Sequence, residues 1–186
     1  IMQYTKEHDW VMDPMGGSGT TVLEALFSNR HCRSYDVNPL SILLQKVKTT
    51  HIDGEVLQNT LDTVCSAYKP LKLCEFDWIP IGIKNIDHWF LTETQNSIRG
   101  LIYLINNIQA EDVRSFFQIC LAASIRPVSR ATTQQGRLFL DVVTAKEDCL
   151  DTFVKRATKA IHAVAALPER TSNLEIGIHD ACVEFD

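Results

Sequence analysis

A glycine-rich turn near the start of the chain carries the residues with the clearest chemical potential. Positions 11–21 read Val-Met-Asp-Pro-Met-Gly-Gly-Ser-Gly-Thr-Thr. Gly16, Gly17 and Gly19 lack Cβ atoms, so this turn can adopt positive φ and let a ligand approach the backbone. The N–H groups of residues 18–21 would open a helix, where unpaired donors can face an anion. In open α/β sheets, such a turn between a strand and a helix holds a nucleotide-like ligand.

Two common nucleotide-binding patterns are excluded by residues that the turn lacks. A dinucleotide fingerprint needs glycine or alanine at the position that Val22 occupies. A phosphate-binding P-loop needs Gly-Lys-Ser/Thr, but Gly19 is followed by Thr20 and Thr21 without a lysine. The turn therefore predicts a nucleotide-like ligand other than a dinucleotide or a nucleotide bound by a P-loop.

An acidic residue follows the turn at a meaningful distance. Residues 32–36 read as a second strand ending in Asp36. An acid about 20 residues past such a turn can accept hydrogen bonds from both hydroxyls of a ribose. Pro39 suits the first turn of the next helix. The apolar face expected for that helix consists of Leu40, Leu43, Leu44 and Val47.

Each of these features also has a purely structural alternative. A glycine turn after a strand is often only a tight connection. Asp36 alone could cap the helix that begins near Pro39. Asp13 could orient the amino group of a ligand, or it could serve only the geometry of its own loop.

Taken together, these residues resemble the first two motifs of S-adenosylmethionine-dependent DNA amino-methyltransferases. The first motif of that family is commonly written Asp-Pro-Phe-x-Gly-Ser-Gly-Thr, and Met15 stands here in place of the phenylalanine. The string Asp-Val-Asn-Pro-Leu at positions 36–40 is also similar to the family. The resemblance implies an α/β fold, a partial Rossmann-like methyltransferase core, which binds S-adenosyl-L-methionine with Asp36 on the ribose.

A third piece of the resemblance lies near the other end of the chain. Residues 173–181 read as a strand that finishes in Asp180 and Ala181. In the family, an acid at this place accepts a hydrogen bond from the adenine amino group, and the backbone of the next residue contacts the adenine ring. The alternative is that Asp180 is only a turn residue. The cofactor-binding residues that the resemblance implies are Asp13, Pro14, Met15, Gly16, Gly17, Ser18, Gly19, Thr20, Asp36, Val37, Asp180 and Ala181.

Within the core that the resemblance implies, we expect a large all-helical insertion between the second and third strands. We expect residues 1–50 to form the cofactor-binding half of the core, residues 51–171 the insertion, and residues 172–186 the third strand and the start of the next. Apolar periodicity predicts helices over residues 55–67, 91–108, 110–127 and 146–167. Trp89 and Phe90 are expected in the core rather than against a base.

The catalytic loop of the resembling family has no counterpart in this sequence. That loop, Asp/Asn/Ser-Pro-Pro-Tyr/Phe, holds the target amine of a flipped base. The chain has 6 prolines, and no two are adjacent. We therefore expect a fragment of a longer enzyme that does not turn over alone and contains no catalytic residue. The intact enzyme would methylate N6 of adenine or N4 of cytosine in DNA. Two alternatives stay open: an RNA amino-methyltransferase, and a non-catalytic helical interaction module with a vestigial nucleotide fold.

The composition is that of a globular chain, with 45% hydrophobic residues. Neither a membrane-length apolar run nor a signal peptide is visible, so a cytoplasmic protein without a membrane partner is expected. The 6 cysteines and 6 histidines show no metal-ligand spacing. Reduced thiols and no bound metal are therefore expected.

The net charge of −5 does not by itself indicate a nucleic-acid partner. However, residues 113–140 contain four arginines and no acidic residue. Arg126, Arg130 and Arg137 are the candidates for contacts with the phosphates of DNA. The alternative is that arginines near the end of a helix only complement its dipole.

Overall fold

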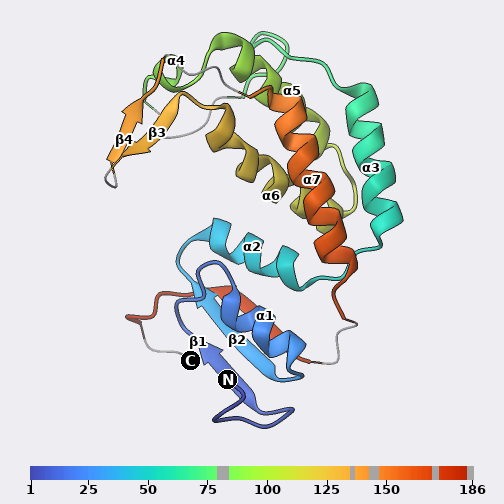
Figure 1. Ribbon diagram of the computed structural model, residues 1–186, viewed down its shortest axis with the longest axis vertical. Helices are drawn as coiled ribbons and strands as arrows, with labels where there is room; N and C mark the ends of the chain where they lie inside the picture. Colours follow the sequence, from blue (N-terminus) through green and yellow to red (C-terminus); the bar gives the residue numbers. More distant parts are fainter. Residues whose placement is uncertain (79–83, 135–136, 143–146, 169–171, 184–186) are drawn as a thin grey trace. The chain divides into compact units, whose positions relative to one another are not determined.

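The computed structural model describes residues 1–78, 84–134, 137–142, 147–168 and 172–183. It divides the chain into two compact units. The first consists of Ile1–Gly54 and His162–Asp186, and the second of Glu55–Ile161. Figure 1 shows the elements of both units along the chain.

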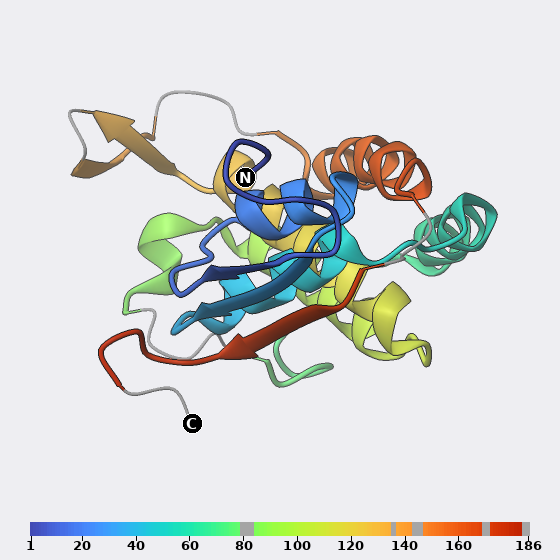
Figure 2. The ribbon, with the colours of Figure 1, turned by 90° about the horizontal axis from the view of Figure 1, so that it is seen from below.

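The first unit is built on a parallel sheet of three strands in the order β1-β2-β5. Figure 2 shows these strands side by side, with β2 between the others. Because the strands are parallel, their carboxyl ends meet at one edge of the sheet, where Asp36 pairs in register with Ile178. The strands are β1 (Trp10–Asp13), β2 (His31–Asp36) and β5 (Leu174–Ile178). The mixed α/β architecture is therefore compatible with the expected methyltransferase-like fold.

Helix α1 (Thr20–Phe27) forms the core of this unit with the sheet. Val22 and Ala25 on α1 are fully buried and pack with Cys32 of β2. Leu174 and Ile176 of β5 pack against the same cluster. Residues of α1, β2 and β5 thus share one apolar layer, which fixes the end of the glycine turn relative to the strands.

Helix α2 (Pro39–Thr49) begins as the sequence predicts but buries a different face. The side chain of Asn38 accepts from the N–H of Leu40, so Asn38 is the helix cap and Asp36 is not. The expected face is only partly right: Val47 is buried and Leu43 and Leu44 are half-buried, but Leu40 is 49% exposed. The buried residues of α2 are Ile42, Gln45, Val47 and Thr49. The helix is rotated so that a polar side chain, Gln45, points inward.

The second unit contains helices around an apolar core. Phe116 and Phe117 of α6 are fully buried, and the Phe117 ring lies 6.1 Å from that of Phe153 on α7. Phe90 is 8% exposed, which confirms its predicted place in the core. The helices are α3 (Gly54–Ala67), α4 (Ile86–Trp89), α5 (Thr92–Asn106), α6 (Glu111–Val128) and most of α7 (Cys149–Ala165).

The expectation of an all-helical insertion is wrong. After α6, the chain forms an antiparallel hairpin of β3 (Ala131–Gln134) and β4 (Arg137–Leu140), which Figure 1 shows at the end of α6. Threonine on β3 and phenylalanine on β4 favour extended backbone, and they form cross-strand pairs such as Thr132 with Phe139. The strands are too short for apolar periodicity to reveal them. The further strand expected to begin at 183–186 lies, apart from Val183, outside the described residues.

All six cysteines are free thiols in this structure. Burial raises the pKa of Cys32 to about 11, and those of Cys120 and Cys149 to about 12.

Among the described residues, no group of histidine, cysteine or acidic side chains could hold a metal ion. No helix in the described ranges has the length and apolar character needed to cross a membrane.

Candidate functional site

A cavity of about 240 Å³ lies at the carboxyl edge of the parallel sheet, and we call it the strand-end cavity. Its walls come from the segments that follow β1, β2 and β5. These segments are distant in sequence but meet because the three strands run in parallel. The lining residues are Pro14, Met15, Asp36, Val37, His179, Asp180, Ala181 and Cys182. Six of the predicted cofactor-binding residues are therefore brought together here.

Asp36 joins the glycine turn to the end of β2. One carboxylate oxygen accepts from the N–H of Gly17 at 2.8 Å, and the other accepts from the N–H of Asn38 at 2.8 Å. An ionised carboxylate offers about four lone-pair sites. Two of them are used by the backbone, so the others can accept hydrogen bonds from a ligand. Asp36 thus shapes the turn and borders the strand-end cavity at the same time.

The glycine turn has the backbone conformation that its sequence predicts. Gly17 and Gly19 have positive φ values of 49° and 81°. The N–H of Gly16 donates to the carbonyl of Tyr35 at 2.8 Å, and the N–H of Gly19 donates to that of Gly16 at 2.8 Å. A Cβ atom on Gly16 would collide with Ser34 Oγ and lie 2.6 Å from Gln45 Nε2. Glycine is therefore required at position 16 by close packing, and at 17 and 19 by conformation.

The turn rests on polar side chains that the sequence reasoning missed. Ser34 and Gln45 are fully buried beneath it, and Gln45 Nε2 donates to the Gly17 carbonyl at 3.5 Å. Lys48 Nζ donates to the Ser18 carbonyl at 2.7 Å. Among the described residues, Ser34 Oγ and Gln45 Oε1 are buried without a hydrogen-bond partner. The turn is thus held from β2 by Asp36 and from α2 by Gln45 and Lys48.

Asp180 shapes the far wall of the strand-end cavity. Its carboxylate accepts from the N–H of Cys182 at 2.9 Å, and its carbonyl accepts from the N–H of Val183 at 2.9 Å. The ring of His179 lies 5.7 Å from that of Tyr35. His179 and Cys182 were not predicted as site residues; their adjacency to Asp180 and Ala181 is the signal that could have identified them.

The remaining predicted residues support the turn without lining the cavity. The Asp13 carboxylate accepts from the N–H of Met15 at 3.1 Å, so it serves the geometry of its own loop. Gly19 occupies the cap position of α1, and Thr20 is the first residue of that helix. Ser18 is exposed, and its carbonyl is the acceptor for Lys48. These residues fix where the turn lies.

The chemistry of the strand-end cavity combines carboxylates with exposed apolar side chains. Asp36 and Asp180 provide acceptors from two different walls. Met15 is 77% exposed and Val37 is 62% exposed, although both are apolar. Carboxylates suit hydroxyl and amino donors, and the apolar side chains suit a flat ring. The arrangement can hold a ligand that presents both kinds of surface.

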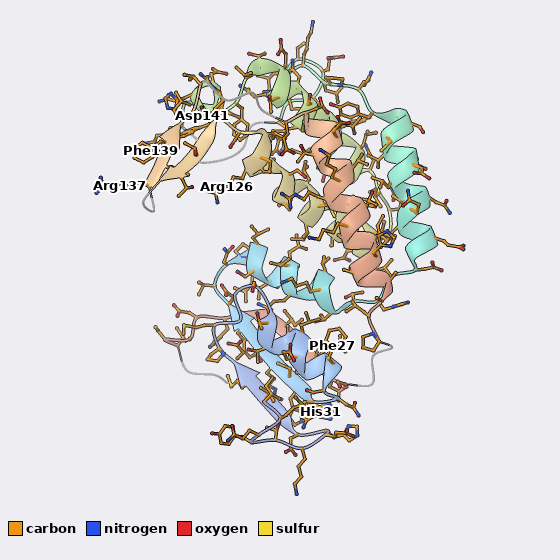
Figure 3. The ribbon with its side chains drawn as sticks, in the orientation of Figure 1. Phe27, His31, Arg126, Arg137, Phe139 and Asp141 are labelled. Atoms are coloured by element: carbon orange, nitrogen blue, oxygen red, sulfur yellow. The ribbon has the colours of Figure 1, made fainter. Side chains whose placement is uncertain are left out.

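The three arginines predicted to contact nucleic acid belong to the second unit. Arg126 donates to Thr133 Oγ1 of the hairpin, and Figure 3 shows Arg126 and Arg137 with exposed side chains. Arg130 is tied to α4: its N–H donates to the Trp89 carbonyl at 2.8 Å, and its guanidinium reaches the Asp87 carbonyl at 3.5 Å. Arg130 thus contacts α4, whereas Arg126 contacts the hairpin.

Comparison with known proteins finds a similarity to a methyltransferase. No protein-family model matches the chain, and no solved structure matches it. The Type II methyltransferase M.MvaI of Kocuria varians is 28% identical to the chain over 139 residues. The matched segment covers 68% of this chain and 29% of the relative, so the chain spans less than a third of the relative's length. The chain is thus similar to part of a Type II methyltransferase, and this similarity supports a methyltransferase relationship.

Proposed function

We propose that this chain is the S-adenosylmethionine-binding part of a DNA methyltransferase that methylates an exocyclic amine, N6 of adenine or N4 of cytosine. The observation that carries the proposal is the meeting of Met15, Asp36 and Asp180 at one cavity on the carboxyl edge of a parallel sheet. This is where open α/β sheets bind nucleotide-like ligands. The similarity to a Type II methyltransferase supports the same reaction class.

Each wall of the strand-end cavity has a role in this proposal. Asp36 accepts from the ribose hydroxyls through the lone pairs that the backbone leaves unused. Asp180 accepts from the adenine amino group, while Val37 and Ala181 face the ring. Met15 covers the turn side of the ligand. When bound, S-adenosylmethionine supplies an activated methyl group on its sulfonium centre.

The size and chemistry of the cavity fit the nucleoside end of this cofactor. Pockets for small ligands usually measure about 300–1,000 Å³. The strand-end cavity is smaller, at about 240 Å³, so it encloses only part of such a ligand. Its two carboxylates match the hydroxyl and amino donors of an adenosine. The exposed apolar area of Met15 and Val37 would be covered by the ring, which favours binding.

Transfer to an amine requires groups that hold the acceptor in line with the methyl. We assign no such group to this chain, so we expect the chain alone to bind the cofactor without turnover. The acceptor itself is proposed to be DNA rather than RNA, because the Type II methyltransferase relative favours it.

Isothermal titration with S-adenosylmethionine tests the cofactor proposal. We expect binding heat from the natural chain and about 30-fold weaker binding for Asp36→Asn, which corresponds to about 2 kcal/mol for a lost charged hydrogen-bond acceptor. Glu24→Gln is the matched control, because Glu24 is exposed on α1 and does not line the cavity. Absence of heat from the natural chain would instead favour a non-catalytic interaction module.

A further inference from the structure

A second cavity, of about 450 Å³, lies entirely within the second unit, and we call it the arginine groove. It is bordered by the end of α6, strand β3 and the outer side of α7. Its polar wall contains Arg126, Thr132, Thr133 and Arg156. The groove therefore pairs two guanidinium groups with two hydroxyl groups, which is the chemistry of an anion site.

Arg126 is positioned in the groove by its own helix and by the hairpin. It lies in the last turn of α6, where a cation complements the helix dipole. Its guanidinium donates to Thr133 Oγ1 on β3, which directs the side chain across the end of the helix. A guanidinium has five N–H donors, so this bond leaves most of them for a ligand.

Arg156 enters the groove from α7, a different element. It is exposed, as is Arg126. Within the described ranges, the one ion pair of the structure joins Arg33 and Glu175, so neither groove arginine has an acidic partner there. Two guanidinium groups on one groove favour a ligand with negative charge.

Asp141 is the opposing charge on the groove wall. Its N–H donates to the carbonyl of Arg130 at 2.7 Å, which fixes the backbone at the end of β4. With two arginines against one aspartate, the groove still carries an excess of positive charge. The carboxylate makes a useful test, because its removal should strengthen the binding of an anion.

We propose that the arginine groove binds the phosphodiester backbone of the DNA that the enzyme modifies, with Arg126 and Arg156 as the phosphate ligands. This inference rests on the proposed function for the choice of DNA. It changes the set of arginines expected from the sequence: Arg156 joins Arg126, whereas Arg130 and Arg137 do not line the groove. Thr132 and Thr133 add hydroxyl donors beside the arginines. Such contacts position the protein on the duplex without reading its sequence.

The surface beside the groove also suits a macromolecule. Arg137 and Phe139 lie on β4, and Figure 3 shows both on the outer part of the hairpin. Phe139 is 45% exposed and Leu138 is 65% exposed. The exposed hairpin, with its cation, extends the surface beside the groove, so that a long DNA backbone could contact both. A small free anion would occupy the groove alone.

The experiment is fluorescence anisotropy of the full 186-residue chain with a labelled DNA duplex, over roughly 50–200 mM salt. Arg126→Gln and Arg156→Gln should each weaken binding about tenfold. Each should also make the negative slope of log K against log salt shallower by about 0.9. Asp141→Asn should strengthen binding. Lys155→Gln is the matched control, because Lys155 is exposed on α7 next to Arg156 but does not line the groove.

Several outcomes would overturn the proposal. The proposal fails if both arginine variants bind the duplex as tightly as the natural chain, or if Lys155→Gln lowers the affinity as much as Arg156→Gln. It also fails if the natural chain does not bind the duplex, or if inorganic phosphate alone saturates the groove. If Arg126→Gln fails to fold by circular dichroism, Arg126→Lys should fold and retain most of the salt slope. Titration with S-adenosylmethionine separates the two proposals: its heat should persist in both arginine variants. If the groove variants bind the DNA duplex more weakly but the natural chain gives no heat with S-adenosylmethionine, only the proposed function fails.

Discussion

Replacing Asp36 with asparagine should loosen the glycine turn as well as weaken the ligand site. The carboxylate accepts from two backbone N–H groups, those of Gly17 and Asn38, both at 2.8 Å. An asparagine side chain has one acceptor oxygen, and its amide nitrogen would face the other N–H as a second donor. One of the two hydrogen bonds is therefore lost, which weakens the link between the turn and the end of β2 and leaves the bond from Gly16 N–H to the Tyr35 carbonyl.

The size of the effect follows from the charge and burial of the group. A hydrogen bond to a charged group contributes about 1.5–3 kcal/mol. Asp36 is only half-buried, so we expect a value near the low end, about 2 kcal/mol once the donor–donor contact is included. Because 1.4 kcal/mol is about tenfold in an equilibrium constant, local opening of the turn should become about 30-fold more frequent.

Hydrogen exchange read by mass spectrometry measures this opening directly. The amide of Gly17 should exchange about 30-fold faster in Asp36→Asn, while the amides of helix α6 should keep their protection. Glu24→Gln, which removes the same charge from the exposed side of α1, should exchange like the natural chain. The reasoning is refuted if the turn keeps its protection in Asp36→Asn. If the turn loosens but the affinity for S-adenosylmethionine is unchanged, the ribose role of Asp36 fails and its structural role stands.

Three further predictions concern other residues. Gly16→Ala should lower the free energy of unfolding by about 2 kcal/mol in urea titrations, because the new Cβ would lie 2.6 Å from Gln45 Nε2 in a fully buried site; an unchanged midpoint contradicts the packing argument. Iodoacetamide should alkylate the exposed Cys182 more slowly with S-adenosylmethionine present, because Cys182 lines the strand-end cavity, whereas the exposed Cys74 should react at the same rate; equal protection of both would argue against that cavity. Burial raises the pKa of Cys120 from 9.0 to about 12, so its contribution to stability should be complete below pH 9 and decline as the pH rises toward 12; the unfolding free energy of Cys120→Ala should fall less steeply over that interval.

The elements around the glycine turn could be predicted because local sequence determines them. Positive φ at positions 17 and 19 favours glycine, and the sequence places glycine at both. Asp36 lies at the end of a buried strand, and parallel pairing then carries it to the same edge as Asp180. The inward face of α6 was also readable, since Phe116 and its apolar neighbours repeat with the period of a helix.

The support beneath the turn could not be predicted, because it depends on how α2 is rotated against the sheet. Gln45 is polar, and a polar residue in an amphipathic pattern is read as solvent-facing. In the structure it is fully buried under the turn, while Leu40 is half exposed. The arginine groove was hidden for a related reason: Arg126 and Arg156 lie on different helices and line one groove only in the tertiary structure.

The cost of burying polar atoms beneath the glycine turn argues that this part of the fold serves a site rather than stability alone. Ser34 Oγ and Gln45 Oε1 have no hydrogen-bond partner among the described residues, and each such atom costs about 1–3 kcal/mol. Apolar side chains in their places would avoid that cost. The bonds from Gln45 Nε2 and Lys48 Nζ, however, hold the carbonyls of Gly17 and Ser18, while Asp36 at the end of β2 holds the N–H of Gly17. A turn ordered in this way needs little further ordering when a ligand binds, so more of the contact energy is retained as affinity.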